Sequence, residues 1–314
     1  MRKLVRVGVI GVGAMGRNHV RIYSQLPKVD LIAVADVDEK LAASVAREYD
    51  CKPYADHNDL LNENLDAVSI AVPTTSHTKV ALDVIQRGIS ILVEKPVTET
   101  VENANQIIEA AQQKGVKLMV GYIERFNPAI MKLKQLISNG QLGDIISISA
   151  KRVGPYNPKV RDVGVILDFG THDIDIMSYL YGKNVKEVYA LAGSVIHGHE
   201  SHAIITLNFN NGGRGVIETN WLTPHKVRSL TVIGSKGIAE VNYIESTLRI
   251  LDKEWVREAK IEKEEPLQVE LLHFIDCVRY DRKPAVSGED GRQALQVALA
   301  AMESVRTGKV YALE

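Results

Sequence analysis

Two segments of the chain carry side chains whose chemistry suits proton transfer. In the first segment, Glu94-Lys95-Pro96 directly follows the apolar run 89–93. A lysine at this position can donate a hydrogen bond to a substrate hydroxyl or help to remove its proton. The structural alternative is a solvated loop lysine followed by a proline that forms a turn.

In the second segment, Asp168 and His172 have i, i+4 spacing at the start of a helical pattern. This spacing predicts that both lie on one helix face, where Asp168 could orient the imidazole or both could meet one substrate. The structural alternative is an acidic residue near a helix N-terminus and a histidine satisfied in the core. Lys95, Asp168 and His172 are therefore our candidates for catalysis.

A glycine-rich turn near residue 11 has the pattern of a dinucleotide-binding site. It lies between a predicted strand and a predicted helix, and Asp36 ends the next predicted strand. The first glycine permits a tight turn, the second lets a pyrophosphate approach backbone N–H groups, and the third allows close helix packing. A carboxylate at position 36 would bind the adenosine ribose and repel a 2′-phosphate, so we expect NAD rather than NADP. The predicted cofactor contacts here are Gly11, Gly13, Ala14, Met15, Gly16 and Asp36.

The elements that must position these residues alternate between short apolar runs and helical patterns from Leu4 to about Gly121. This alternation predicts right-handed crossovers and a parallel sheet. Lys95 then falls at the carboxyl end of a parallel strand, which is the edge at which open α/β sheets bind ligands. The predicted strands are residues 5–10, 31–35, 67–72, 90–94 and 117–121.

After Tyr122 the pattern changes to one helix and then strand-like runs joined by turn signals, which predict antiparallel hairpins. We therefore predict an α/β Rossmann domain over residues 1–121 and a C-terminal α+β domain over residues 122–314. The second domain is expected to be built on a large, mostly antiparallel open sheet, with its last helix a candidate to pack back on the Rossmann domain. The strand-like runs are 145–152, 185–195, 203–209, 214–221, 229–233, 238–241 and 247–251, and the closing helices are 267–280 and 291–307.

Length and composition narrow the class of protein. A chain of 314 residues exceeds what one core usually organises, so two domains are expected. Its 38 Lys and Arg against 39 Asp and Glu give a net charge of -1, so we expect neither a nucleic acid nor a membrane as partner. Two cysteines, Cys51 and Cys277, are too few for a disulfide scaffold and favour a reducing cytoplasm.

A histidine cluster is the main candidate for a metal site. His197, His199 and His202 have the spacing His-x-His-x-x-His, but they fall between two strand-like runs, as residues of an exposed hairpin loop would. Hydride transfer to NAD requires no metal ion. We therefore expect no metal site.

Together, these motifs resemble the glucose-fructose oxidoreductase and inositol dehydrogenase family, and the resemblance runs nearly end to end. It implies an NAD-dependent dehydrogenase that acts on the hydroxyl of a sugar or a related compound and forms a homodimer or homotetramer. The resemblance is carried by residues 11–16, 72–77, 94–96, 121–128, 164–175, 274–278 and 287–291.

The resemblance also implies roles for individual residues. Lys95, Asp168 and His172 match the catalytic lysine, aspartate and histidine of the family. The residues implied at the cofactor are Pro73, Thr74, His77, Glu94 and Lys95, and those implied at the substrate are Tyr122, Arg125, Asn127, Arg152, Tyr156 and Arg161.

Within the family, residues 151–165 are most similar to enzymes that oxidise the 3-hydroxyl of UDP-N-acetylglucosamine. Arg152, Lys159 and Arg161 could meet its diphosphate, or they could be surface charges of a loop. The chemistry then needs a base, which is either His172 held by Asp168 or Lys95 itself. The alternative functions are a dehydrogenase of a free sugar or myo-inositol, and a noncatalytic NAD-binding sensor.

Overall fold

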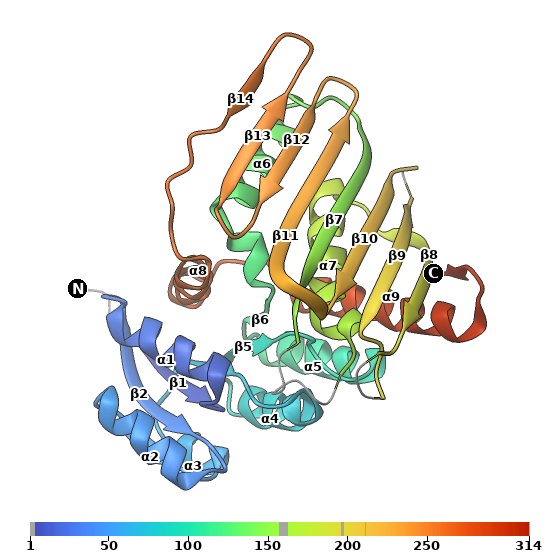
Figure 1. The fold of residues 1–314 in the computed structure, drawn as a ribbon. Coiled ribbons are helices and arrows are strands. Elements are labelled where there is room, and N and C mark those ends of the chain that lie inside the picture. The colour runs from blue at the N-terminus through green and yellow to red at the C-terminus, as the bar shows by residue number, and fades with distance from the viewer. Residues whose placement is uncertain (1–3, 157–162, 196–197, 211, 314) are drawn as a thin grey trace. The chain divides into compact units, whose positions relative to one another are not determined.

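The computed structural model of the protein describes residues 4–156, 163–195, 198–210 and 212–313, and Figure 1 shows its fold. The chain divides into two compact units. One contains Met1–Ile123 and Glu265–Arg292, and the other contains Glu124–Glu264 and Gln293–Glu314. Helix α9 (Gly288–Thr307) therefore belongs in part to each unit.

The first unit is built on a six-stranded parallel sheet with the strand order β3-β2-β1-β4-β5-β6. This is the order of a doubly wound Rossmann fold, in which the direction of winding reverses between β1 and β4. The predicted α/β Rossmann domain is confirmed. Its strands are β1 (Val5–Ile10), β2 (Val29–Ala35), β3 (Lys52–Tyr54), β4 (Ala67–Ile70), β5 (Ser90–Glu94) and β6 (Leu118–Gly121).

Local signals start and end the helices that connect these strands. Asp38 accepts hydrogen bonds from two backbone N–H groups at the start of α2, and Thr100 accepts one at the start of α5. Gly115 ends α5 at a φ of 67°, in the left-handed region that favours glycine. The helices of this unit are α1 (Ala14–Gln25), α2 (Glu39–Glu48), α3 (His57–Leu60), α4 (Thr74–Gln86), α5 (Val101–Lys114) and α8 (Pro266–Tyr280).

Helix α8 belongs to the first unit although it lies far along the chain. It packs against α1, and Lys28 bonds Asp276 at 2.9 Å. Its apolar side chains, among them Leu271 and Phe274, are fully buried. The second unit is therefore smaller than the predicted domain 122–314, because Glu265–Arg292 packs with the Rossmann sheet.

The second unit is built on a nine-stranded sheet with the order β14-β13-β12-β11-β7-β10-β9-β8-β15. Among the strand pairs of the described residues in this sheet, only that of β7 with β10 is parallel, so the predicted mostly antiparallel sheet is confirmed. The strands are β7 (Ile145–Pro155), β8 (Val185–Gly193), β9 (His202–Phe209), β10 (Arg214–Asn220), β11 (Leu222–Gly234), β12 (Ile238–Asn242), β13 (Thr247–Leu251), β14 (Val256–Glu258) and β15 (Tyr311–Ala312).

Helices cover one face of this sheet, as Figure 1 shows. Helix α6 (Pro128–Ser138) packs on β12 and β13, and α7 (Thr171–Tyr181) packs on β7 and β10. Ser304 of α9 accepts a hydrogen bond from the backbone N–H of Ala190 on β8. Two short helical turns, η1 (Ile123–Phe126) and η2 (Ile166–Gly170), precede α6 and α7.

The opposite face of the nine-stranded sheet leaves apolar side chains open to solvent. Leu191 and Ile204 are opposite each other on β8 and β9 and are 57% and 51% exposed. On β10, Glu218 is opposite Ile204, and Val216, two residues earlier on the same face, is 42% exposed. Alternation along each strand points the neighbouring residues, such as Ile205 and Ile217, into the helix-covered core. The exposed row is therefore a property of the strand register.

Candidate active site

The glycine-rich turn after β1 has a different steric reason for each of its three glycines. Gly11 has a φ of 83°, and a Cβ there would lie 2.6 Å from the carbonyl oxygen of Ala71. A Cβ on Gly16 would lie 1.8 Å from the carbonyl oxygen of Gly11, so α1 could not pack this closely on the turn. Gly13 meets nothing within 4 Å, which leaves room for a phosphate beside the start of α1.

Asp36, the first residue after β2, is fixed against this turn. Its carboxylate accepts hydrogen bonds from the backbone N–H of Val12 at 2.8 Å and of Asp38 at 3.0 Å. Both bonds hold the carboxylate at the carboxyl edge of the sheet, next to Gly11. This is the placement that a carboxylate needs in order to bind the ribose hydroxyls of a dinucleotide.

A cavity of about 1040 Å³ opens at this carboxyl edge. Its lining comes from the segments that follow four neighbouring strands, so it straddles the point between β1 and β4 where the winding reverses. Ligands of open α/β sheets bind at such a point. The lining includes Gly11 and Gly13 after β1, Asp36 and Val37 after β2, residues 55–58 after β3, and residues 71–73 after β4.

Of the predicted cofactor contacts, four line this cavity, namely Gly11, Gly13, Asp36 and Pro73. The lining also contains residues that sequence patterns did not single out. Asp56, His57 and Asn58 follow β3, and Ser76 and Lys79 belong to α4. These residues could have been found from their position in the sequence, because the segments that follow parallel strands all lie at the same edge of the sheet.

We predict that Asp36→Asn weakens the preference for NAD over NADP by about tenfold or more, because it removes the charge that repels a 2′-phosphate. The amide oxygen can still accept the Val12 N–H, while the bond from the Asp38 N–H is lost at a cost of about 1 kcal/mol, so we expect the turn to stay folded. Dissociation constants for NADH and NADPH, measured by the fluorescence of their reduced nicotinamide, check this. Asp38→Asn is the matched control, since Asp38 caps α2, and an equal loss of preference there would contradict the prediction.

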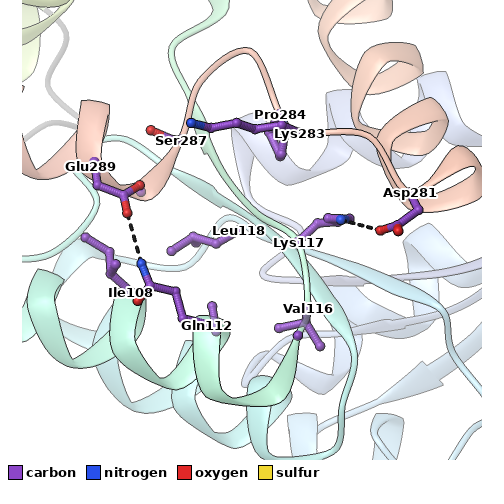
Figure 2. A pocket seen from close by; sticks show the side chains of 13 residues that line it. Ile108, Gln112, Val116, Lys117, Leu118, Asp281, Lys283, Pro284, Ser287 and Glu289 are labelled. Carbon is purple, nitrogen blue, oxygen red and sulfur yellow. Dashed lines mark hydrogen bonds and ion pairs between the residues drawn. The ribbon is translucent and has the colours of Figure 1, made fainter.

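A second cavity of about 430 Å³ in the first unit lies at the opposite edge of the sheet (Figure 2). It is lined by the end of α5, the start of β6 and the loop between α8 and α9. Lys117 immediately precedes β6 and pairs with Asp281, and Gln112 bonds Glu289 at 3.1 Å. The amino ends of the strands meet here, so this cavity is not the expected coenzyme site.

Glu94, the last residue of β5, turns its carboxylate into the protein. The side chain of His19 on α1 contacts it, with Nε2 3.0 Å from Oε1. A Cβ on Gly121 would lie 2.9 Å from the same carboxylate, so the glycine makes room for it. Glu94 is only 8% exposed, which argues against the predicted direct contact with a coenzyme. Lys95, which follows it, is partly exposed and precedes a cis proline, Pro96.

His77 on α4 lies between two backbone segments of the first unit. Its Nδ1 is 3.0 Å from the carbonyl oxygen of Pro96, and its Nε2 is 2.9 Å from that of Val72. The ring is 1% exposed, and burial lowers the pKa of His77 below its ordinary value. His77 therefore touches the coenzyme cavity through Val72 rather than with its own side chain.

In the second unit, Asp168 lies in the π-helical turn η2, and His172 lies in the first turn of α7. Both are partly exposed, whereas their neighbours Thr171 and Asp173 are buried. The predicted helix starts with a wider turn than the α-helical i, i+4 spacing assumes. Such π turns are frequent at functional sites, because they change where the side chains of one turn point.

Arg152, a predicted substrate contact, is 1% exposed. Its Nε and Nη2 bond Asp173 at 2.8 and 3.1 Å, and its Nη1 bonds Glu124 at 2.9 Å. Burial alone would lower the pKa of the guanidinium, but Asp173 and Glu124 raise it well above its ordinary value. These bonds commit Arg152 to the interior of the unit and argue against its contact with a diphosphate.

The other predicted substrate contacts also differ in what they touch. Arg125 forms a bidentate pair with Asp175, at 2.8 and 2.6 Å, and both side chains are buried. Asn127 caps α6, and Tyr122 is 0% exposed. Tyr156 is partly exposed, and the centroid of its ring lies 5.6 Å from that of the Trp221 ring. Arg161 lies outside the described residues.

Comparison with known proteins agrees with this geometry. The model of the "Oxidoreductase family, NAD-binding Rossmann fold" matches residues 5–122, and that of the "GFO/IDH/MocA C-terminal domain" matches residues 130–240. The chain belongs to the GFO/IDH/MocA oxidoreductase family. Its first unit is thus an NAD-binding Rossmann domain, and its coenzyme is NAD. The chain is therefore a sugar or polyol oxidoreductase.

Among its relatives, the UDP-N-acetylglucosamine 3-dehydrogenase of Acidithiobacillus ferrooxidans is 30% identical over 305 residues, which cover 94% of this chain and 95% of that enzyme. A solved structure of that enzyme has a TM-score of 0.90 and covers 96% of this chain and 98% of its own. The myo-inositol 2-dehydrogenase of Thermotoga maritima is 29% identical in an alignment 331 positions long, gaps included, which covers 99% of this chain and 99% of that enzyme. This GFO/IDH/MocA protein is therefore similar to dehydrogenases of two different substrate types.

Two findings concern other classes of site. Within residues 4–156, 163–195, 198–210 and 212–313, no three His, Cys, Asp or Glu side chains are grouped so that they could hold a metal ion. His197 of the histidine cluster lies outside these ranges, and His199 and His202 are exposed. In the same part of the chain, every helix is too short or too polar to cross a membrane.

Proposed function

We propose that the protein oxidises the 3-hydroxyl of UDP-N-acetylglucosamine to a ketone and passes the hydride to NAD. The observation that carries this proposal is the likeness to the Acidithiobacillus enzyme, which extends over nearly the whole of both chains at 30% identity. The fold alone supports many substrates, so the assignment depends on that likeness and on the test below.

The proposed roles divide the chemistry between hydride and proton. Bound NAD supplies the acceptor for the hydride that leaves the carbon of the hydroxyl. Gly13 gives the pyrophosphate access to the start of α1, and Asp36 binds the adenosine ribose. His172, oriented by Asp168, takes the hydroxyl proton, while Lys95 donates to the hydroxyl oxygen and stabilises its developing negative charge.

Aromatic rings of the second unit support a site for a nucleotide sugar. The partly exposed rings of Tyr156 and Phe169 pack on the buried Trp221, with centroids 5.6 and 6.2 Å from its centroid, and Phe169 adjoins Asp168 in sequence. Flat aromatic faces bind sugar rings and bases. Since Arg152 is buried, we assign the predicted diphosphate contact to Arg228, whose side chain is 29% exposed. Its Nη1 lies 3.6 Å from Oε1 of Glu124, and its guanidinium lies 5.5 Å from the centroid of the Phe169 ring.

The test incubates the purified protein with NAD and one of four substrates, and follows the absorbance of reduced nicotinamide. The substrates are UDP-N-acetylglucosamine, N-acetylglucosamine, glucose and myo-inositol. We expect reduction with the nucleotide sugar only, and competitive inhibition by UDP. Reduction of NAD with a free sugar but not with the nucleotide sugar would overturn the proposal. No reduction of NAD with any of the four substrates would favour a noncatalytic sensor.

The second candidate is a myo-inositol dehydrogenase, because the Thermotoga relative is nearly as similar and matches 99% of each chain. The two candidates share the hydride chemistry and differ in the group that recognises the substrate. UDP separates them, since it should compete with a nucleotide sugar and should have no effect on the oxidation of inositol.

The exposed row on the nine-stranded sheet supports self-association, as a homodimer or homotetramer, through that face. We predict that Ile204→Glu shifts the protein toward the monomer, because it places a charge among Leu191, Val216 and their copies. Light scattering after size exclusion measures the mass. Ile244→Glu is the control, since Ile244 is 57% exposed but lies in the turn after β12. An unchanged mass for Ile204→Glu would contradict the prediction.

Both cysteines of the chain support a cytoplasmic location. Cys51 and Cys277 are free thiols. Burial raises the pKa of Cys51 to about 11 and raises that of Cys277, so both are expected to stay protonated and unreactive. Thiols of this kind need no oxidising compartment.

A further inference from the structure

Two buried histidines hold the residues on either side of Lys95. His19 contacts the Glu94 carboxylate at 3.0 Å, and His77 contacts the Pro96 carbonyl at 3.0 Å. We propose that His19 and His77 are positioning residues, which together fix the backbone from which the Lys95 side chain reaches out. The inference rests on the proposed function only in that Lys95 is taken to be catalytic.

The two contacts come from opposite faces of the Rossmann sheet. Helix α1 connects β1 to β2, and α4 connects β4 to β5, so the two crossovers run in opposite directions from the central pair β1 and β4. Right-handed crossovers that run in opposite directions place their helices on opposite faces. His19 and His77 therefore hold the segment at residues 94–96 from both sides, which resists displacement better than two contacts on one face.

Each helix also begins at the coenzyme cavity. Helix α1 starts directly after the turn that contains Gly11 and Gly13, and α4 starts directly after Val72 and Pro73, and all four residues line the cavity. A histidine about one turn into each helix then reaches the end of β5. Through His19 and His77, the first turns of α1 and α4 thus connect the segments that line the coenzyme cavity to the segment that carries Lys95.

The surroundings fix the orientation of the His19 ring. Tyr23, one turn further along α1, lies edge-on to it with ring centroids 6.4 Å apart, and the Tyr23 hydroxyl bonds Ser69 at 2.7 Å. Gly121 leaves space for the Glu94 carboxylate, as described above. Nδ1 of His19 is buried and has no hydrogen-bond partner among the described residues. The contact to Glu94 is therefore the polar interaction that this ring makes.

His77 faces two carbonyl oxygens, but a neutral imidazole carries one N–H. Burial lowers the pKa of His77, which favours the neutral ring. Only one of the two contacts is then a hydrogen bond at a time. Positioning of Lys95 requires the tautomer with hydrogen on Nδ1, which donates to Pro96. His19 requires the other tautomer, with hydrogen on Nε2, which donates to Glu94.

This difference in tautomer allows two matched variants at each histidine. The amide nitrogen of asparagine can take the place of Nδ1, and that of the longer glutamine can take the place of Nε2. We expect His77→Asn and His19→Gln to keep the bonds beside Lys95, and His77→Gln and His19→Asn to lose them. A role in core packing alone would not produce this reversal between the two sites.

The readout is the rate at which trace acetic anhydride acetylates Lys95 across pH, measured by mass spectrometry relative to the exposed Lys114. His77→Gln and His19→Asn should change the relative rate by roughly three- to tenfold, the effect of one lost hydrogen bond. They should also lower kcat by up to about a hundredfold, while the affinity for NAD changes much less. Wild-type labelling in all four variants, or the same change in all four, would overturn the proposal.

Nitrogen-15 NMR of the wild-type protein tests the same proposal without any variant that must fold. It should find hydrogen on Nδ1 of His77 and on Nε2 of His19 at neutral pH. Hydrogen on Nε2 of His77 would mean that Val72 is held instead of Pro96, and would overturn the proposal. Neither labelling nor NMR needs a substrate, so these results still decide the positioning if the protein oxidises none of the substrates tested. Normal turnover in a Lys95 variant would remove Lys95 from the mechanism, and the labelling and NMR results would stand apart from it.

Discussion

Lys95→Met should lower kcat for the oxidised sugar by roughly 10²–10⁴-fold, the usual contribution of a group that moves or stabilises a proton in the transition state. Methionine has a similar length and lacks the ammonium, so packing at the end of β5 should change little. Lys95 is not part of the lining of the coenzyme cavity. We therefore expect the dissociation constant for NAD to stay close to that of the wild type.

Steady-state absorbance gives kcat and KM, and titration calorimetry gives the affinity for NAD. Lys114→Met is the matched control, because Lys114 is an exposed lysine at the end of α5. It should leave kcat as it is. Turnover of Lys95→Met close to the wild-type value, with a substrate that the wild type oxidises, would remove Lys95 from the mechanism.

Arg152→Met should destabilise the second unit by about 3–5 kcal/mol, the usual cost of removing one partner of a buried ion pair. The change leaves Asp173 and Glu124 in the interior without the three hydrogen bonds that now stabilise their charge. Asp173 is 1% exposed, so water cannot replace the guanidinium. The loss should therefore exceed that of any surface ion pair in the unit.

Both tryptophans, Trp221 and Trp255, belong to the second unit, so intrinsic fluorescence during urea unfolding reports this unit. We expect a lower midpoint with an unchanged slope. Arg249→Met, which breaks the exposed pair with Glu240, should cost less than about 1 kcal/mol. Adding Asp173→Asn to Arg152→Met should recover part of the loss, and equal losses for Arg152→Met and Arg249→Met would contradict the argument.

The coenzyme turn could be predicted because its signal is local. Gly11, Gly13 and Gly16 occupy fixed offsets between a strand and a helix, and Asp36 ends the next strand. The spacing alone places these residues at one edge of a parallel sheet. Most strands of the two sheets followed in the same way from alternation and turn residues, whereas the short strands β3, β14 and β15 were not predicted.

The surroundings of the remaining site residues could not be predicted, because they depend on partners far away in sequence. Nothing beside Arg152 indicates that Asp173 and Glu124 will surround it, since an arginine in a strand has the same pattern whether it is buried or exposed. Likewise, Glu94 turns inward because His19 lies 75 residues earlier on α1. The sequence pattern indicated which side chains could take part in catalysis or binding, but not which charged side chains already form ion pairs in the interior.

The late position of helix α8 in the chain has a consequence for folding during synthesis. During synthesis, all six strands of the Rossmann sheet leave the ribosome before α8, which packs on α1 and whose side chains Leu271 and Phe274 are fully buried in the finished unit. Making Glu124–Glu264 in between takes roughly 7 to 28 s at a usual rate of about 5–20 residues per second. For that time the part of α1 and β1 that α8 covers in the finished unit stays open to water, so the first part of the chain to appear is not the first that can finish folding.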